Sequence, residues 1–167
     1  KDDLYDQALL ALHKKHYDHP SDAEILYKHA QYLRYRETPA GAPKDNLRQA
    51  MSELQDAVRR HPDTYGAALC KSAIEEIGMH SLQVTVEEAS LPNQPLLYQL
   101  EYKNLSKVWT KVVPVSAFGR WNESVDWEKQ LDKLNSIRSV QQRVWTLNNP
   151  GDYYAHKTEL SLEGLPV

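Results

Sequence analysis

The chain has 167 residues, a mass of 19.2 kDa and a formal net charge of −3. Its 41% hydrophobic and 26% charged residues are typical of a folded chain with one domain or two small ones, and exclude a disordered segment. Residues 1–79 carry 11 Lys and Arg against 13 Asp and Glu, and residues 81–167 carry 9 against 10, so neither half has the basic balance of a nucleic-acid-binding domain.

Residues 1–79 have the apolar periodicity of four amphipathic helices. The expected apolar stripes are Leu4, Ala8, Ala11 and Leu12; Leu26, Ala30 and Leu33; Leu47, Ala50, Met51, Leu54, Ala57 and Val58; and Tyr65, Ala68, Leu69, Ala73 and Ile77. Ser21 and Glu24 have the spacing of a capping box at the start of the second helix. The segment "ETPAGAP", with two prolines and a glycine, predicts a loop before the third helix.

The third helix carries a pattern of small, large and small residues followed by a proline, at Ala50, Leu54, Ala57 and Pro62. The first helix repeats it less well, at Ala8, Leu12 and Pro20, with Lys15 in place of the second small residue. This half therefore resembles a pair of tetratricopeptide-like helical hairpins. Such repeats are usually stable only in groups of three or more, so we expect these helices to rest on the β half.

Residues 81–167 predict five strands and a short helix. The alternating stretch "SLQVTVEEA" predicts that Leu82, Val84 and Val86 point inward and that Gln83, Thr85 and Glu87 point outward, and Leu96–Lys103 alternates in the same way. A polar break at "KNLS" followed by "KVWTKVVPV" predicts a hairpin over residues 96–115. "VQQRVWTLNN" and "YYAHKTELSLEGL" predict two more strands around the turn "NPGD", and "VDWEKQLDKLNSI" predicts the helix. Five strands leave a sandwich with unpaired edges.

The order "LQVTVEEASLPNQPLLYQLEYKNLSKVW" and then "RVWTLNNPGDYYAHKTELSLEGLP" resembles the first macroglobulin-like domain of large bacterial alpha-2-macroglobulin family proteins. The matching elements are the strand from Leu82, the "PNQP" turn, the Tyr102-x-Asn104-Leu105 segment and "NPGDYYAHKTELSLEGLP". In the branch it most resembles, tetratricopeptide-like helices precede that domain. The resemblance implies an α+β chain in which an antiparallel α-hairpin layer (1–79) precedes an incomplete macroglobulin- or immunoglobulin-like antiparallel β-sandwich with a short inserted helix (81–167).

The resemblance also implies a role and a location. We expect a non-catalytic structural or interaction module of a large exported protein, in the periplasm or at the bacterial cell surface, serving protease inhibition or envelope defence. The expected partners are other domains of the parent chain, with proteases or envelope proteins as further candidates. Because family domains usually continue beyond "LP" with a glycine and another strand, we expect this chain to be an excised segment. The family's bait region and Cys-Gly-Glu-Gln thioester do not occur in it.

No motif predicts an enzyme, a cofactor or a metal site. The single cysteine, Cys70, lies in a helical stretch and is expected to be a structural thiol rather than a nucleophile. His13, His16 and His19 are expected to be polar residues at a helix end rather than zinc ligands, because zinc needs three or four converging ligands.

The candidate partner-binding residues are aromatic. Trp121 and Trp127 lie in the insert "FGRWNESVDWEKQ", where loops on a rigid scaffold often bind partners. The alternative function is a helical-repeat adaptor that binds a peptide, and it would use Tyr27 and Tyr35. We also expect that an exposed edge strand near the C-terminus pairs two copies as a homodimer. No apolar run approaches the ~20 residues needed to span a bilayer.

Overall fold

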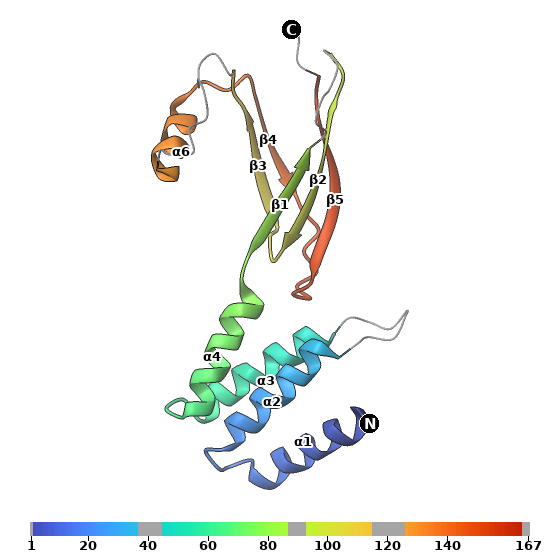
Figure 1. The fold of residues 1–167 in the computed structure, drawn as a ribbon, viewed down its shortest axis with the longest axis vertical. Coiled ribbons are helices and arrows are strands. Elements are labelled where there is room, and N and C mark those ends of the chain that lie inside the picture. The colour runs from blue at the N-terminus through green and yellow to red at the C-terminus, as the bar shows by residue number, and fades with distance from the viewer. Residues whose placement is uncertain (1, 37–44, 87–92, 115–125, 165–167) are drawn as a thin grey trace. The chain divides into compact units, whose positions relative to one another are not determined.

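The structure is a computed structural model that describes residues 2–36, 45–86, 93–114 and 126–164. It confirms the predicted α+β class: four packed helices are followed by antiparallel strands in two small sheets, with a helix inserted in the β half (Figure 1). The chain divides into two compact units. The first comprises residues 1–104 and 149–167, and the second comprises residues 105–148.

The first unit begins with four helices. They are α1 (Asp2–His16), α2 (Asp22–Tyr35), α3 (Asn46–Arg60) and α4 (Tyr65–Gly78). Helices α2, α3 and α4 pack on one another, and α1 packs on α2. The hydroxyl of Thr64 accepts a hydrogen bond from the amide of Ala67 and caps α4. The loop predicted at 37–43 lies outside the described residues.

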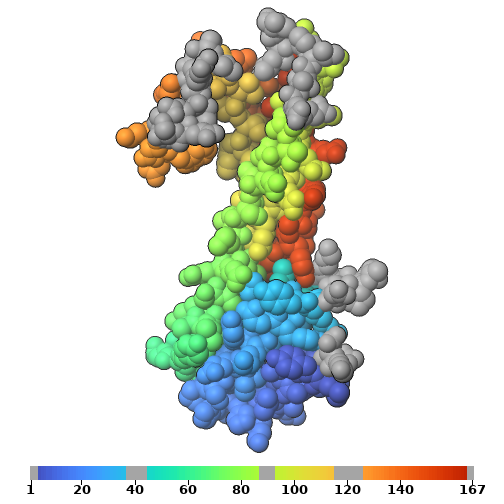
Figure 2. Space-filling model, viewed as in Figure 1, coloured from blue at the N-terminus to red at the C-terminus, as the bar shows by residue number. Residues whose placement is uncertain are grey.

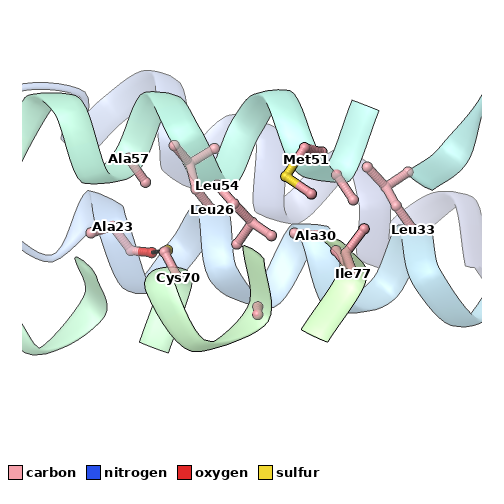
Figure 3. Packing of buried hydrophobic residues seen from close by; sticks show 11 residues of the cluster. Ala23, Leu26, Ala30, Leu33, Met51, Leu54, Ala57, Cys70 and Ile77 are labelled. Carbon is pink, nitrogen blue, oxygen red and sulfur yellow. Dashed lines mark hydrogen bonds between the residues drawn. The ribbon is translucent and has the colours of Figure 1, made fainter. Parts of the chain in front are cut away.

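The core of α2, α3 and α4 combines large and small side chains (Figure 3). Its buried members are Ala23, Leu26, Ala30, Leu33, Ala50, Met51, Leu54, Ala57, Cys70, Ala73 and Ile77. At Gly66 of α4, an added Cβ would lie 2.6 Å from the backbone nitrogen of Glu24 and 2.8 Å from the Cβ of Ala23. The small residues therefore let α2 and α4 approach to backbone contact. The predicted stripe of α2 is confirmed, but in α4 Ala68 and Tyr65 are exposed and Cys70 is buried instead.

The apolar stripe predicted for the first helix is wrong. Leu4, Leu12 and the two alanines between them are exposed, and among the described side chains of α1 only Leu9 is a buried apolar one. The side that meets α2 carries Asp6, Leu9 and His13, which follow one another at i, i+3 and i+7. This side faces the polar partners Asp22 and His29 of α2. Apolar periodicity cannot reveal such partners.

The predicted capping box is also wrong. Ser21 occupies the N-cap position of α2, but its hydroxyl forms no cap hydrogen bond. Instead, its Oγ lies 2.7 Å from Nδ1 of His19, in a hydrogen bond that competes with capping.

The sheet of the first unit has the strand order β1-β2-β5, and both pairings are antiparallel. The strands are β1 (Ser81–Val86), β2 (Leu96–Lys103) and β5 (Ala155–Leu162). As predicted, alternate residues of β2 share a buried face, with Tyr98, Leu100 and Tyr102 all buried. The opposite face is mostly polar, although it also carries the exposed Leu97, and it includes the cross-strand ion pair between Glu101 and Lys157, 3.0 Å long.

The predicted hairpin over residues 96–115 is wrong. Strand β3 (Lys107–Val112) pairs with β4 (Gln141–Thr146) in a second sheet, and β2 pairs with β1 and β5. The change of sheet begins at Asn104, whose φ of +57° lies in the left-handed region. Its side-chain amide donates hydrogen bonds to the carbonyl oxygens of Ile77 (3.0 Å) and Met79 (3.1 Å). The turn at Asn104 is therefore hydrogen-bonded to the C-terminal end of α4 and does not connect the two strands of a hairpin.

The second unit comprises β3, β4 and α6 (Trp127–Ser136), which lies where a helix was predicted. The ammonium group of Lys111 donates to the carbonyl oxygens of Leu134 (2.7 Å) and Asn135 (2.9 Å), near the C-terminus of α6. A cation at this end of a helix interacts favourably with the helix dipole. These bonds attach α6 to β3.

Candidate functional site

The structure describes three of the four predicted aromatic residues. Trp121 lies outside the described residues. Trp127 is the first residue of α6, in the second unit, and exposes 60% of its surface. Tyr27 is half-buried against the helical core, whereas Tyr35, at the end of α2, exposes 75%. The guanidinium carbon of Arg34 lies 5.6 Å from the centre of the Tyr35 ring. Of the two tyrosines, only Tyr35 is well exposed to a partner.

Cys70 is buried in α4, and its Sγ lies 3.5 Å from the carbonyl oxygen of Ala23. Burial raises the pKa of the thiol to about 11. A nucleophilic cysteine needs the opposite shift, which a nearby base or cation produces. In its present environment Cys70 fills the space between α2 and α4.

The three histidines near the end of α1 have separate partners. Nδ1 of His13 lies 2.8 Å from a carboxylate oxygen of Asp22, and Nδ1 of His19 lies beside the Ser21 hydroxyl. The rings of His16 and His19 are 6.2 Å apart in an edge-on arrangement. Within the described ranges, no group of three or more His, Cys, Asp or Glu side chains converges as metal ligands would.

A buried histidine joins three helices. His29 of α2 exposes 2% of its surface and lies between two carboxylates. Its Nε2 is 2.7 Å from Oδ1 of Asp6 in α1, and its Nδ1 is 2.6 Å from Oε2 of Glu53 in α3. Since a carboxylate only accepts, both ring nitrogens donate, and the ring is an imidazolium. Neither nitrogen keeps a lone pair, so His29 in this state cannot act as a general base.

A second buried network joins α1, α2 and α3 at the other end of the layer. Asp22 is fully buried and accepts hydrogen bonds from His13 and from Nη1 of Arg60, each 2.8 Å long. Arg60 also donates to Asp56 (2.7 Å) and to the carbonyl oxygen of Tyr17 (2.8 Å). Burial alone would raise the pKa of Asp56, but its hydrogen bonds with Arg60 and Arg59 hold that pKa below its usual range. Asp22 is thus a buried carboxylate whose partners include the cationic guanidinium group of Arg60.

Neither network was predicted from the sequence, although the sequence contains a signal for each. His29 lies three residues after Leu26 and four before Leu33, inside the apolar stripe of α2, and Asp22 lies four residues before Leu26. A polar residue on a buried stripe requires a partner, because burying it without one costs free energy. The partners, Asp6 and Glu53, are 23 and 24 residues away, so spacing could not identify them.

The surface of the first unit carries apolar side chains as well. Strand β1 is exposed along its whole length, so the prediction that Leu82, Val84 and Val86 point into a core is wrong. Each of the three exposes between 44% and 50% of its surface. In the space-filling view this lime-green strand lies in full view (Figure 2). Their register partners on β2 (Tyr102, Leu100 and Tyr98) are buried. One face of the sheet is therefore buried at its centre and open along β1.

Comparison of the chain with protein-family models, curated proteins and solved structures found no match. In the described part of the chain, no helix combines the length and the apolar character needed to cross a membrane.

Proposed function

We propose that this chain is a non-catalytic structural and interaction module of a large exported alpha-2-macroglobulin-like protein that serves protease inhibition or envelope defence. The family and the extracytoplasmic location rest on the resemblance of the β half. The observation that supports an interaction module is the row of Leu82, Val84 and Val86, which continues the buried face of the sheet but is exposed. The proposed occupant of this row is a β-strand or sheet face of a neighbouring domain in the parent chain.

The composition of β1 supports a β-strand partner. Its six residues, Ser81–Val86, include no charged side chain and no proline. Edge strands that must remain unpaired usually carry such residues as protection. The other edge strand, β5, has His156, Lys157 and Glu159 in its sequence. Of the two edges, β1 is the better template for strand addition.

The test begins with the parent reading frame, in which further β domains must follow. The next domain is produced separately, and its binding to this chain is measured by calorimetry. We expect Val84→Lys to abolish binding, because it places a charge in the apolar row. Gln83→Lys, on the opposite face of the same strand, is the matched control and should leave binding unchanged. A reading frame without β domains contradicts the family, and a following domain that does not bind contradicts the role of β1.

Two rival outcomes are measured with the same proteins. A dimer of the chain alone in light scattering, lost in Val84→Lys, would assign β1 to pairing between copies. For the adaptor alternative, a peptide library is screened with the wild type and with Tyr35→Ala. Tyr35 is the better residue to change, because Tyr27 packs against the helical core and its loss would also destabilise the fold. Peptide capture that requires Tyr35 would replace the proposed function.

A further inference from the structure

Helix α1 is attached to the rest of the helical layer mainly through polar groups. Leu9 is the buried apolar side chain among its described residues. Its other contacts include the Asp6–His29 bond, the His13–Asp22 bond, the ion pair of Asp6 with Arg36 and the edge-on packing of Tyr5 against Tyr32, with ring centres 5.6 Å apart. A helix with so little apolar burial depends on its polar contacts to remain docked.

The bond between Asp6 and His29 requires a proton that the ring loses when it becomes neutral. A neutral imidazole has one N–H donor and one lone pair. If His29 keeps the bond to Glu53, its Nε2 lone pair faces the carboxylate of Asp6 across 2.7 Å, and if it keeps Asp6, the lone pair faces Glu53. In either arrangement a nitrogen lone pair faces a carboxylate oxygen in a buried site, and the two atoms repel each other. Docking of α1 and protonation of His29 are therefore linked.

We propose that His29 is a proton-controlled latch: when its ring is protonated α1 is docked on α2 and α3, and when the ring loses a proton α1 is released. The released helix remains joined to the chain through the segment that follows His16. The apolar core shared by α2, α3 and α4 contains no residue of α1, so we expect it to persist when α1 is released. Release uncovers the side of α2 that carries His29 and Tyr32.

The groups around His29 fix the direction of the response. Asp6 faces it from α1 and Glu53 from α3, while on its own helix the ring of Tyr32 stacks at 6.3 Å. Arg36 lies 3.7 Å from Asp6 and offsets part of its charge. The described residues of α4 form no hydrogen bond or ion pair with His29. Two carboxylates in contact thus outweigh one more distant cation.

The hydrogen bond with Glu53 raises the pKa of His29 above its ordinary value of 6.5, and although burial opposes it, the bond with Asp6 adds to the increase. Release of α1 removes Asp6 from the ring but leaves Glu53 in place, so the contribution of Asp6 is the part that links protonation of His29 to docking. Through this contribution a protonated ring favours docking, and docking weakens as the pH rises through the raised pKa of the docked state. The latch is therefore closed below that raised pKa and opens above it.

His13, one of the two histidines of α1, differs from His29 in its contacts. Its Nδ1 is bonded to one carboxylate, that of Asp22, whereas the ring of His29 lies between two. The contact of His13 therefore needs a single N–H donor, which an imidazole ring has in either charge state.

The experiment is hydrogen–deuterium exchange of the full chain between pH 6 and pH 9, corrected for the intrinsic pH dependence of exchange. In the wild type we expect the protection of residues 2–16 to fall with rising pH, while the protection of α3 persists. In His29→Gln, residues 2–16 should exchange rapidly at every pH. An unchanged protection of α1 across this range, after correction, would overturn the latch.

A second variant keeps the test decisive if His29→Gln fails to fold. Asp6→Asn changes a partly exposed position, and the new amide can accept from a protonated Nε2 or donate to a neutral one. We expect α1 to stay docked in this variant and to lose its pH dependence. Asp18→Asn, which removes an equal charge at an exposed position, is the control and should retain the pH dependence. Wild-type pH dependence in Asp6→Asn would contradict the proposal.

Discussion

In helices α2–α4 the large apolar side chains point inward, and Leu26, Leu54 and Ile77 expose 3% of their surface or less. In the β1-β2-β5 sheet, β2 is buried on one face, whereas its neighbour β1 is exposed at all six residues. The helical trio buries its large aliphatic side chains within this chain, while the described part of the sheet buries them on one face of β2 and leaves those of β1 exposed. We infer that the trio stabilises the fold and that the open strand is available for contacts.

Besides the bonds of Asn104 to the end of α4, the segment before β5 contacts the helices. The guanidinium group of Arg48 in α3 donates hydrogen bonds to the carbonyl oxygens of Pro150 and Gly151, just before β5. Tyr153 packs against the helical core. The segment that leads into β5 is therefore anchored on the helices, and the opposite edge of the sheet, β1, lacks such an anchor among the described residues.

The largest expected effect comes from the centre of the trio. Leu54→Ala removes a fully buried side chain of α3 and leaves a cavity among α2, α3 and α4. We expect the free energy of unfolding to fall by about 2–5 kcal/mol. Urea denaturation followed by circular dichroism at 222 nm measures it. Leu97→Ala, at an exposed position of β2, is the control, and an equal loss in both variants would contradict a core centred on the helices.

The next effect tests the close approach of α2 and α4. Gly66→Ala introduces a Cβ within 2.8 Å of the backbone of Ala23 and Glu24, so the two helices must separate. We expect a destabilisation of about 1–3 kcal/mol, even though alanine favours a helix. Gly78→Ala is the matched control, because nothing lies within 4 Å of its added Cβ, and it should be neutral or stabilising by up to about 1 kcal/mol. Gly66→Ala at least as stable as the wild type would refute the contact.

A smaller effect is expected at Asn104, which links α4 to the end of β2. Asn104→Gly keeps the positive φ but loses the two hydrogen bonds to Ile77 and Met79, at a cost of about 0.5–1.5 kcal/mol. Asn104→Ala also has to adopt a left-handed conformation, which adds about 1–2 kcal/mol. Thermal and urea unfolding of both variants separate the two contributions. Equal stabilities of the two variants would show that the backbone conformation contributes nothing.

Local pattern predicted most of the helices and strands, but it did not predict which strands pair. The apolar alternation of Leu96–Lys103 correctly identified the buried face of β2. It could not show that β5, more than fifty residues later, is its partner rather than the adjacent β3. Pairing depends on non-local contacts, and at Asn104 a hydrogen bond to another element replaced the expected hairpin turn.

The polar networks show a second limit of sequence analysis. His29 is unusual in the sequence because it lies within an apolar stripe. The identity of its partners, however, depends on how α1 and α3 pack against α2. The same packing made Leu9, and not Leu4 or Leu12, the buried residue of α1. Helical periodicity identifies a segment as a helix. It does not show which side of the helix packs against its neighbours when apolar residues occur on several sides.

The smallest effect is expected on the open strand. Val84 and Leu100 are register partners on one face of the sheet, but Val84 is half-exposed and Leu100 is buried. Val84→Thr keeps the shape and the β propensity of the side chain, so we expect the free energy of unfolding to change by less than about 0.5 kcal/mol. Leu100→Ala, across the same pair, should cost about 2–5 kcal/mol in the same urea titration. If Val84→Thr were as costly as Leu100→Ala, then β1 would already be covered within the chain, and the surface proposed for a partner would not exist.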